Sequence, residues 1–373
     1  MFARCKADPA VTPVQIGDMR FPAGVYPVEP MEPLQGFAQV FEPADGDDDA
    51  GEWEEWPDRY VYDVVISADR LPTLVRSLLG IFPPRVYPIL DVIGHDAYRE
   101  IDPFISYELI GLDRMLDALR SYADYFFEDG MCGFGAMCDD PFIYMFVDEH
   151  KVLTVRCTTQ AQPRVERLLK SFDLEQIEEP AGPDAAAHEH RSVLITPDEE
   201  PSLLAEDEVL EALRDEWRLI LNIDPDTNLD DDGKPLGTTA WRCVTRISTP
   251  DTGTGPEPHR RYAEVLLYAD SLSDAEELAA DAALAQADDP AADGGTDDGQ
   301  DPVPAASTAK ELIEAASAGP TPEPASADDL PMFDLDADIV HADRLTAAQL
   351  SEMIKPDRAP PASPGQLIRL NWS

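Results

Sequence analysis

The sequence predicts an α+β protein with two small modules, each built from an antiparallel or mixed sheet with helices packed on one face. Three observations support this class. Hydrophobic residues make up 43% of the 373 residues, which is enough to form a core. From residue 59 onward, strand and helix patterns alternate, and then several strands follow one another, which is typical of α+β proteins. A segment rich in Ala, Pro and acidic residues at 178–190 breaks the pattern and is expected to be a linker.

Residues 1–58 are predicted to form an N-terminal arm that is rich in proline and acidic residues. Proline fixes φ and lacks a backbone donor, so long helices and central strands are not expected in this arm. Its apolar side chains are expected to lie over a neighbouring core; they are Phe21, Val25, Tyr26, Phe37 and Phe41.

The first module is expected at 59–177. β-Branched and aromatic residues predict a strand at 60–67, and leucines at helical spacing predict a helix that ends at Gly80. A strand at 85–94 contains Pro88, which suggests a sheet edge or a bulge. An amphipathic helix at 111–130 follows, and then three strands and a closing helix complete the module.

The second module is expected at 191–287. It begins with a helix near 204–215, and alternating apolar residues then predict a strand at 216–223. Two further strands and a final helix follow an acidic loop; their residues are 239–248, 260–269 and 271–287.

The rest of the chain is expected to be a disordered acidic linker at 288–330 and a tail at 331–373. The linker has almost no large apolar side chains, so it cannot bury enough surface to offset its ordering entropy. Short hydrophobic segments return in the tail, and such segments dock on their own domain or on a partner. The tail is therefore the predicted binding site for a protein partner.

The charge of the chain is strongly one-sided. Asp and Glu number 75 and Lys and Arg 28, which gives a formal net charge of −47. This charge repels nucleic acid and anionic lipid, so neither is an expected partner. Three interpretations stay open: adaptation to a salt-rich proteome, a dedicated acidic interaction protein, or an acidic mimic of nucleic acid that occupies basic proteins.

Several absences point to a soluble protein of the cytoplasm. No apolar stretch is long enough to span a bilayer, and the first residues lack the apolar run of a signal peptide. The five cysteines form no C-x-x-C pair, and an odd number without an export signal favours buried thiols in a reducing compartment.

The strongest local signal is the acidic loop at 222–237, where oxygen-bearing residues stand at every second position: Asp224, Asp226, Asn228, Asp230 and Asp232. Such spacing offers the oxygen ligands that Ca²⁺ or Mg²⁺ prefers. The loop departs from the EF-hand pattern, since Thr239 stands where a glutamate belongs and the flanks predict strands. A solvated loop built from Asx-turns is the competing interpretation.

The histidines and glycines give weaker signals. His188 and His190 form an H-x-H pair inside the predicted linker, and His150 stands in a predicted turn beside Asp148 and Glu149, where a general base is conceivable but a solvated side chain is more common. The cluster His95–Asp102 is expected to be a surface ion-pair network. The glycines at 130–135 follow a helix and precede a strand, which is the wrong order for a phosphate loop.

The sequence therefore predicts an interaction or scaffold protein without an evident catalytic site, more plausibly not an enzyme, and it assigns no catalytic residue and no organic cofactor. One alternative is a divalent-cation-binding protein or metal-dependent enzyme that uses Asp224–Asp232 with Ca²⁺ or Mg²⁺. The second alternative is the acidic nucleic-acid mimic.

Overall fold

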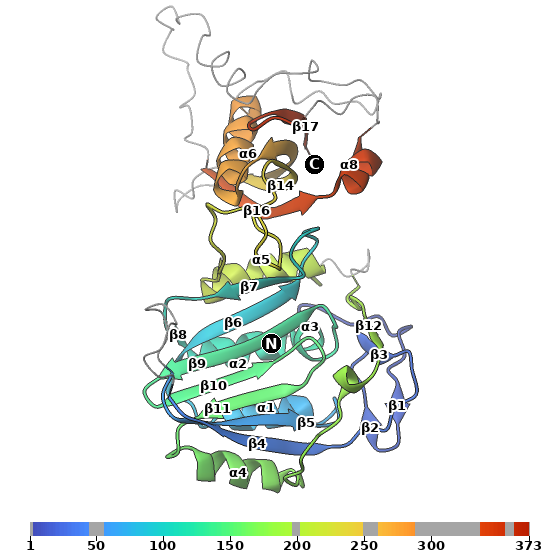
Figure 1. Ribbon diagram of the computed structural model, residues 1–373, viewed down its shortest axis with the longest axis vertical. Helices are drawn as coiled ribbons and strands as arrows, with labels where there is room; N and C mark the ends of the chain where they lie inside the picture. The colour runs from blue at the N-terminus through green and yellow to red at the C-terminus, as the bar shows by residue number, and fades with distance from the viewer. Residues whose placement is uncertain are drawn as a thin grey trace, which may run out of the picture. The chain divides into compact units, whose positions relative to one another are not determined.

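The computed structural model describes residues 3–44, 56–195, 202–248, 260–287, 336–354 and 362–372. Its helices and antiparallel sheets confirm the α+β class (Figure 1). The chain divides into two units, of which the first holds residues 1–93 and 101–222 and the second holds residues 94–100 and 223–373. The division after Asn222 differs from the boundary that the sequence predicts at 178–190.

The first unit contains a nine-stranded antiparallel sheet with the order β13-β7-β6-β9-β10-β11-β5-β4, and β8 pairs with β6. Along β10, Ile143, Met145 and Val147 are buried in the main core, whereas the residues between them are partly exposed. This period of two is what a strand with one buried face requires. The strands are β4 (Gly36–Glu42), β5 (Arg59–Val65), β6 (Arg85–Ile93), β7 (Ile101–Ile105), β8 (Ile110–Gly111), β9 (Cys132–Asp139), β10 (Phe142–Val147), β11 (Leu153–Cys157) and β13 (Ile220–Leu221).

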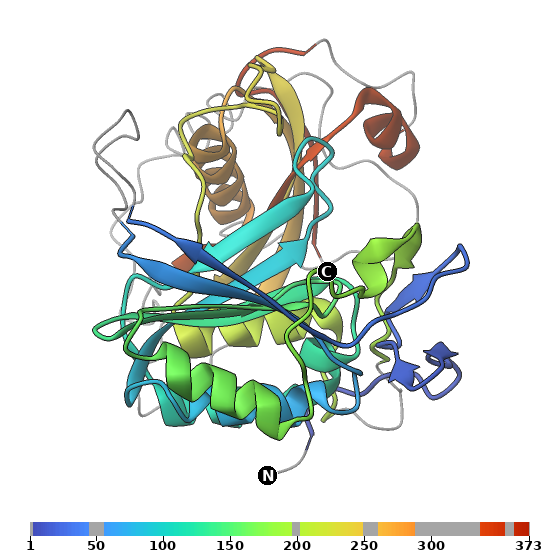
Figure 2. The same ribbon diagram turned by 60° about the horizontal axis from the view of Figure 1, so that its bottom comes forward.

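Five helices of this unit gather on one face of the sheet, as predicted (Figure 2). Leu71, Leu74 and Leu78 of α1 are fully or almost fully buried at the 3.6-residue spacing, and Pro72 is tolerated in the first turn. The helices are α1 (Leu71–Leu79), α2 (Leu112–Ser121), α3 (Ala123–Phe127), α4 (Gln162–Ser171) and α5 (Glu206–Trp217).

Helix α5 explains why the first unit extends to residue 222. Trp217 is 0% exposed, and its ring stacks on Phe126 of α3 with 5.6 Å between centroids. The predicted strand at 216–223 is wrong in its first half, because Glu216 and Trp217 end this helix. Only Ile220–Leu221 pairs as a strand, with β7.

Two further expectations are corrected. The predicted helix at 111–130 breaks at Tyr122, whose φ of −114° and ψ of 35° are not helical. The predicted edge position of Pro88 is also wrong, since β6 lies between β7 and β9. Pro88 stands where the neighbour of β6 changes from β8 at 85–86 to β7 at 89–93, so its missing N–H breaks no regular ladder.

The N-terminal residues belong to the first unit. They form β1 (Gln15–Ile16), β2 (Met19–Arg20), β3 (Val25–Pro27) and edge strand β4. Met19 and Phe21 pack with Val65 in a small cluster, and Phe37 is 0% exposed. The predicted linker at 178–190 also lies in this unit. It contains the short 3₁₀ helix η1 (Pro183–Ala185) and β12 (His188–His190), which pairs with β3.

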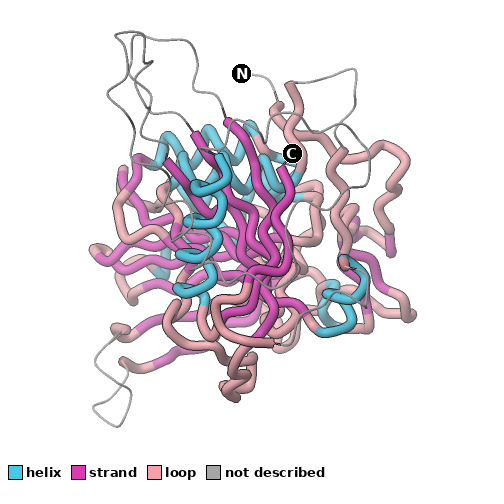
Figure 3. The backbone as a smooth tube through the Cα atoms, turned by 90° about the horizontal axis from the view of Figure 1, so that it is seen from above, coloured by secondary structure: helices cyan, strands magenta, loops and turns pink. Residues whose placement is uncertain are grey.

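The second unit is a four-stranded antiparallel sheet with the order β16-β14-β15-β17. Helix α6 (Leu272–Ala287) packs along its long strands (Figure 3), and α8 (Ala347–Met353) contributes Leu350 to a smaller cluster that also holds Leu266. The strands are β14 (Thr239–Ser248), β15 (Arg260–Ala269), β16 (Asp336–Leu345) and β17 (Leu367–Trp372). Two tail segments therefore supply the edge strands of this sheet, while the predicted linker at 288–330 lies outside the described residues.

Candidate metal centre

Three histidines converge in the first unit. His150 stands in the turn between β10 and β11, and His188 and His190 stand on β12. The ring centroids are 4.7 Å apart for His150 and His188, 4.8 Å for His150 and His190, and 5.0 Å for His188 and His190. One nitrogen of each ring lies within 4.8 Å of one nitrogen of each other ring. All three residues are partly exposed, so the cluster is open to solvent.

Strand β12 places two of the rings on one side. His188 pairs with Pro27 and His190 with Val25 of β3, so the two histidines are separated by one residue and share a face. Glu189, between them, points to the other side, where its carboxylate accepts a hydrogen bond from the Tyr26 hydroxyl.

The β10–β11 turn is fixed by its own side chains. The Asp148 carboxylate accepts a hydrogen bond from the Val152 N–H at 2.8 Å, and the Lys151 N–H donates to the Asp148 carbonyl at 3.0 Å. Lys151 has a φ of 66°, which is uncommon for a non-glycine residue. Its side chain is buried and its ammonium donates to the Cys132 carbonyl, which anchors the turn to β9.

In each ring, Nδ1 already has a partner. His188 Nδ1 lies 2.7 Å from the Ala186 carbonyl oxygen, and His190 Nδ1 lies 2.8 Å from the Gly130 carbonyl oxygen. A carbonyl only accepts, so both Nδ1 atoms donate, and the lone pair of each neutral ring is left on Nε2. His150 Nδ1 lies 3.4 Å from carboxylate oxygens of its neighbours Asp148 and Glu149. Histidines that bind metals are oriented by outer-shell contacts of this kind.

A close crossing of two chain segments positions the acceptor of His190. A Cβ on Gly130 would lie 2.2 Å from the Gly24 carbonyl oxygen, and a Cβ on Gly24 would lie 2.1 Å from the Gly130 nitrogen. Arg191 holds the two segments together. Its N–H donates to the Gly24 carbonyl oxygen at 2.9 Å, and its carbonyl oxygen accepts from the Gly130 N–H at 3.2 Å. Neither glycine has room for a side chain.

The surroundings shift the pKa values of His150 and His190 in opposite directions. Burial alone would lower the pKa of His150, but the hydrogen bond to Asp148 and the charges of Asp148 and Glu149 outweigh it, so this pKa is raised. Burial lowers the pKa of His190, and the neighbouring His150 and His188 lower it further.

The arrangement suits a divalent transition-metal ion. Imidazole nitrogen is a preferred ligand of Zn²⁺, Cu²⁺, Ni²⁺ and Fe²⁺. With tetrahedral Zn–N bonds of about 2.0–2.1 Å, ligand nitrogens lie roughly 3.4 Å apart. Ring nitrogens that are now up to 4.8 Å apart would therefore have to approach one another by up to about 1.4 Å. Three protein ligands also leave one tetrahedral position for water.

The acidic loop that the sequence singles out at 222–237 lies in the second unit from Ile223 onward, and Asp224 and Asp230 accept hydrogen bonds from backbone N–H groups. Asp224 accepts from the Asp226 N–H at 3.1 Å, and Asp230 accepts from Asp232 at 3.1 Å and Lys234 at 2.8 Å. Asp230, Asp231 and Asp232 also line a cavity of about 370 Å³ with Glu100. Within the described ranges, the convergent ligand sets both include His150 and neither includes this loop. Ca²⁺ or Mg²⁺ binding there stays a prediction.

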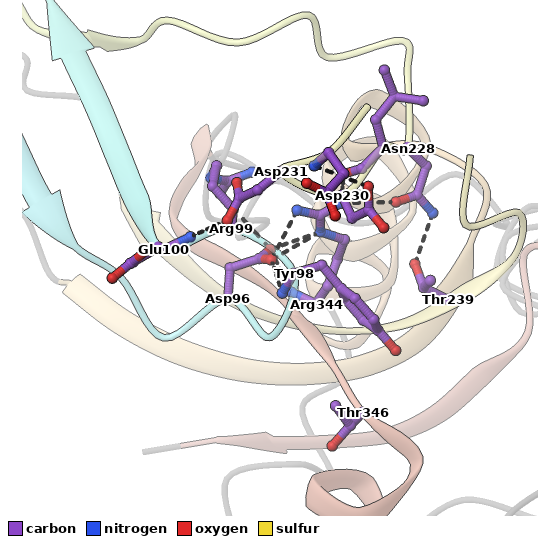
Figure 4. Close-up of polar contacts among 12 residues, drawn as sticks. Asp96, Tyr98, Arg99, Glu100, Asn228, Asp230, Asp231, Thr239, Arg344 and Thr346 are labelled. Carbon is purple, nitrogen blue, oxygen red and sulfur yellow. Dashed lines mark hydrogen bonds and ion pairs between the residues drawn. The ribbon is translucent and has the colours of Figure 1, made fainter. Parts of the chain in front are cut away.

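Asn228 of that loop has a structural role. Its amide nitrogen donates to the Gly237 carbonyl at 2.6 Å and to the Thr239 hydroxyl at 2.9 Å, and its oxygen accepts from Arg344 at 3.1 Å. Arg344 also binds Asp96 at 2.9 Å, and both side chains are nearly inaccessible (Figure 4). The predicted surface ion-pair network around His95–Asp102 is therefore wrong at Asp96, which forms a buried pair.

Sequence reasoning named all three histidines but did not group them. The available signal is the H-x-H pair together with a turn histidine flanked by acidic residues, but the pair falls in the linker predicted at 178–190. What was missing is the pairing of β12 with β3, which joins residues more than 150 positions apart. The five cysteines are buried and free, as predicted.

Comparisons with protein-family models, with curated proteins and with solved structures each return no match. Among the helices of the described ranges, none has the length and apolar character needed to cross a membrane.

Proposed function

We propose that this protein binds a divalent transition-metal ion of the zinc class through His150, His188 and His190. The observation that carries the proposal is the convergence of three imidazoles, each with its Nδ1 next to a carbonyl or carboxylate oxygen. When each ring is neutral and carries its proton on Nδ1, the three Nε2 lone pairs are available to one ion.

Electrostatics support a cation at this position. Asp148, Glu149 and Asp184 raise the pKa of His150, so the local potential is negative. A dipositive ion is favoured there for the same reason that a proton is. The partly exposed rings also leave a path for the ion to enter.

Calorimetric titration of the metal-free full chain with Zn²⁺ tests the proposal. We expect one saturable site, whose affinity falls in His188→Gln and His190→Gln by more than the roughly 10- to 100-fold that loss of an outer-shell partner costs. His95→Gln is the matched control, since His95 is exposed and belongs to the second unit. No saturable binding, or equal affinity in all variants, contradicts the proposal.

The sequence predicts that a protein partner binds the tail at 331–373, and that stays a prediction. A second proposal, which comes from the structure, is that a partner binds at edge strand β4 of the first unit. It is favoured by Val40 and Phe41 on edge strand β4, which are 57% and 48% exposed. Edge strands with exposed apolar residues are sites where another chain can add a strand. If β4 is such a site, Val40→Lys weakens binding of a partner that the wild-type chain retains, and Val28→Lys, at another exposed apolar residue, does not.

A further inference from the structure

The outer surface of helices α1 and α4 is positively charged in a chain that is otherwise strongly acidic. Together the two helices contain four basic residues, Arg76, Arg164, Arg167 and Lys170, and one acidic residue, Glu166. Four minus one gives +3 for these two elements, against a net charge of −47 for the chain. The helices contact one another and lie side by side beneath the sheet (Figure 2).

A cavity of about 350 Å³ lies between these helices. Its volume falls in the range of small-ligand sites. No acidic residue lines it, although one residue in five of the chain is Asp or Glu. The lining residues are Ser77, Gly80, Ile81, Arg164, Arg167, Leu168 and Ser171.

The two arginines of the cavity are available to a ligand. Lys170 is paired with Glu166 at 3.2 Å, and Arg76 donates to the Pro72 carbonyl at 3.1 Å. Arg164 and Arg167 are exposed, and within the described ranges neither has an ion pair or a side-chain hydrogen bond. They stand three positions apart on α4, so their guanidinium groups share one side of the helix.

We infer that this α1–α4 cavity binds the phosphate group of a small phosphorylated ligand. Guanidinium groups present forked N–H donors that match phosphate oxygens in a bidentate manner. Ile81 and Leu168 offer apolar contact to the rest of the ligand. The hydroxyls of Ser77 and Ser171 at the same cavity already donate to the Thr73 and Leu168 carbonyls, at 2.8 Å and 2.7 Å, so the two arginines supply the donors for a phosphate. An anion is repelled from most of this chain, so the acid-free cavity is where one can approach. This inference is independent of the histidine site.

Titration of the full chain with pyrophosphate at constant ionic strength, followed by NMR or calorimetry, tests the inference. We expect saturable binding that weakens by roughly tenfold or more in Arg164→Gln/Arg167→Gln, because the double variant removes the charged hydrogen bonds from both guanidinium groups to the phosphate. Arg120→Gln is the matched control, since Arg120 is exposed on α2 and lies outside the cavity.

Two results overturn the inference. One is the absence of saturable pyrophosphate binding at millimolar concentrations. The other is binding that the double variant leaves unchanged. If poly-glutamate binds and pyrophosphate does not, the basic surface fits an acidic protein instead, and the phosphate site is rejected. Far-UV circular dichroism of the double variant verifies that α4 is still folded.

Discussion

At the scale of single residues, Asp91 gives a stability prediction. Burial raises the pKa of this β6 carboxyl from 3.8 to about 6, and Glu149 adds to the effect. The folded state therefore holds the proton more tightly than the unfolded state, so Asp91 contributes stability below about pH 4 that is lost as the pH rises through 6. We expect Asp91→Asn to be more stable than wild type by about 1–3 kcal/mol at pH 7.5, and to show little difference at pH 4. Urea unfolding at both pH values measures this, and an equal difference at both contradicts the assignment.

Gly130 gives a second prediction at this scale. An alanine here would bring Cβ to 2.2 Å from the Gly24 carbonyl, so the backbone must shift, and with it the carbonyl that accepts from His190. We expect Gly130→Ala to cost about 1–3 kcal/mol of stability and to weaken Zn²⁺ binding. Gly80→Ala is the control, because Gly80 has a φ of −66° and its nearest contact is at 3.1 Å. Zinc affinity that is unaltered by Gly130→Ala would show that the crossing does not position His190.

At the scale of elements, helix α5 joins residues 206–217 to the core of the first unit. Trp217 of α5 and Trp241 of β14 are 0% and 1% exposed, and they lie in different units. We expect Trp217→Ala to destabilise the first unit by about 3–5 kcal/mol and Trp241→Ala to destabilise the second by a similar amount. Hydrogen exchange resolved by peptide distinguishes them. If either variant instead loses hydrogen-exchange protection in the unit that does not contain the substituted tryptophan, the assignment of that tryptophan to its unit is contradicted.

Sequence patterns predicted most elements but not their partners. The spacing of Leu71, Leu74 and Leu78 specifies a helix because the period is local. The register of β12 against β3, and the buried pair of Asp96 with Arg344, depend on contacts between distant segments, which local patterns do not encode. For that reason the sequence does not predict that His150, His188 and His190 converge, although each of them stands in a polar segment. The prediction of an edge strand at Pro88 is wrong because the cost of a missing N–H depends on which strand lies beside it, and the sequence does not specify that neighbour.

At the scale of the whole molecule, the net charge of −47 predicts salt-dependent stability. Repulsion among exposed carboxylates opposes the compact state, and salt screens it, with a Debye length of about 8 Å at 0.15 M. We expect the melting temperature to rise as KCl is increased from 0.05 M to 2 M, with most of the rise also seen when NaCl replaces KCl. An unchanged melting temperature would mean that the carboxylates are too widely spaced to repel. A rise with micromolar Zn²⁺ at fixed ionic strength would be a separate, specific effect.

The strand order of the second unit affects how it can be synthesised. β14 and β15 pair with each other in the middle of its sheet, while β16 and β17, which cover their outer edges, come from residues 336–372. A ribosome therefore releases the central hairpin some 65 residues before the first of its flanking strands, and until then both of its edges can pair with foreign strands. Any premature stop before residue 336 yields a chain with this hairpin permanently uncovered, which a protease or chaperone can recognise. The central hairpin of the second unit thus depends on residues 336–372 to cover its two edges.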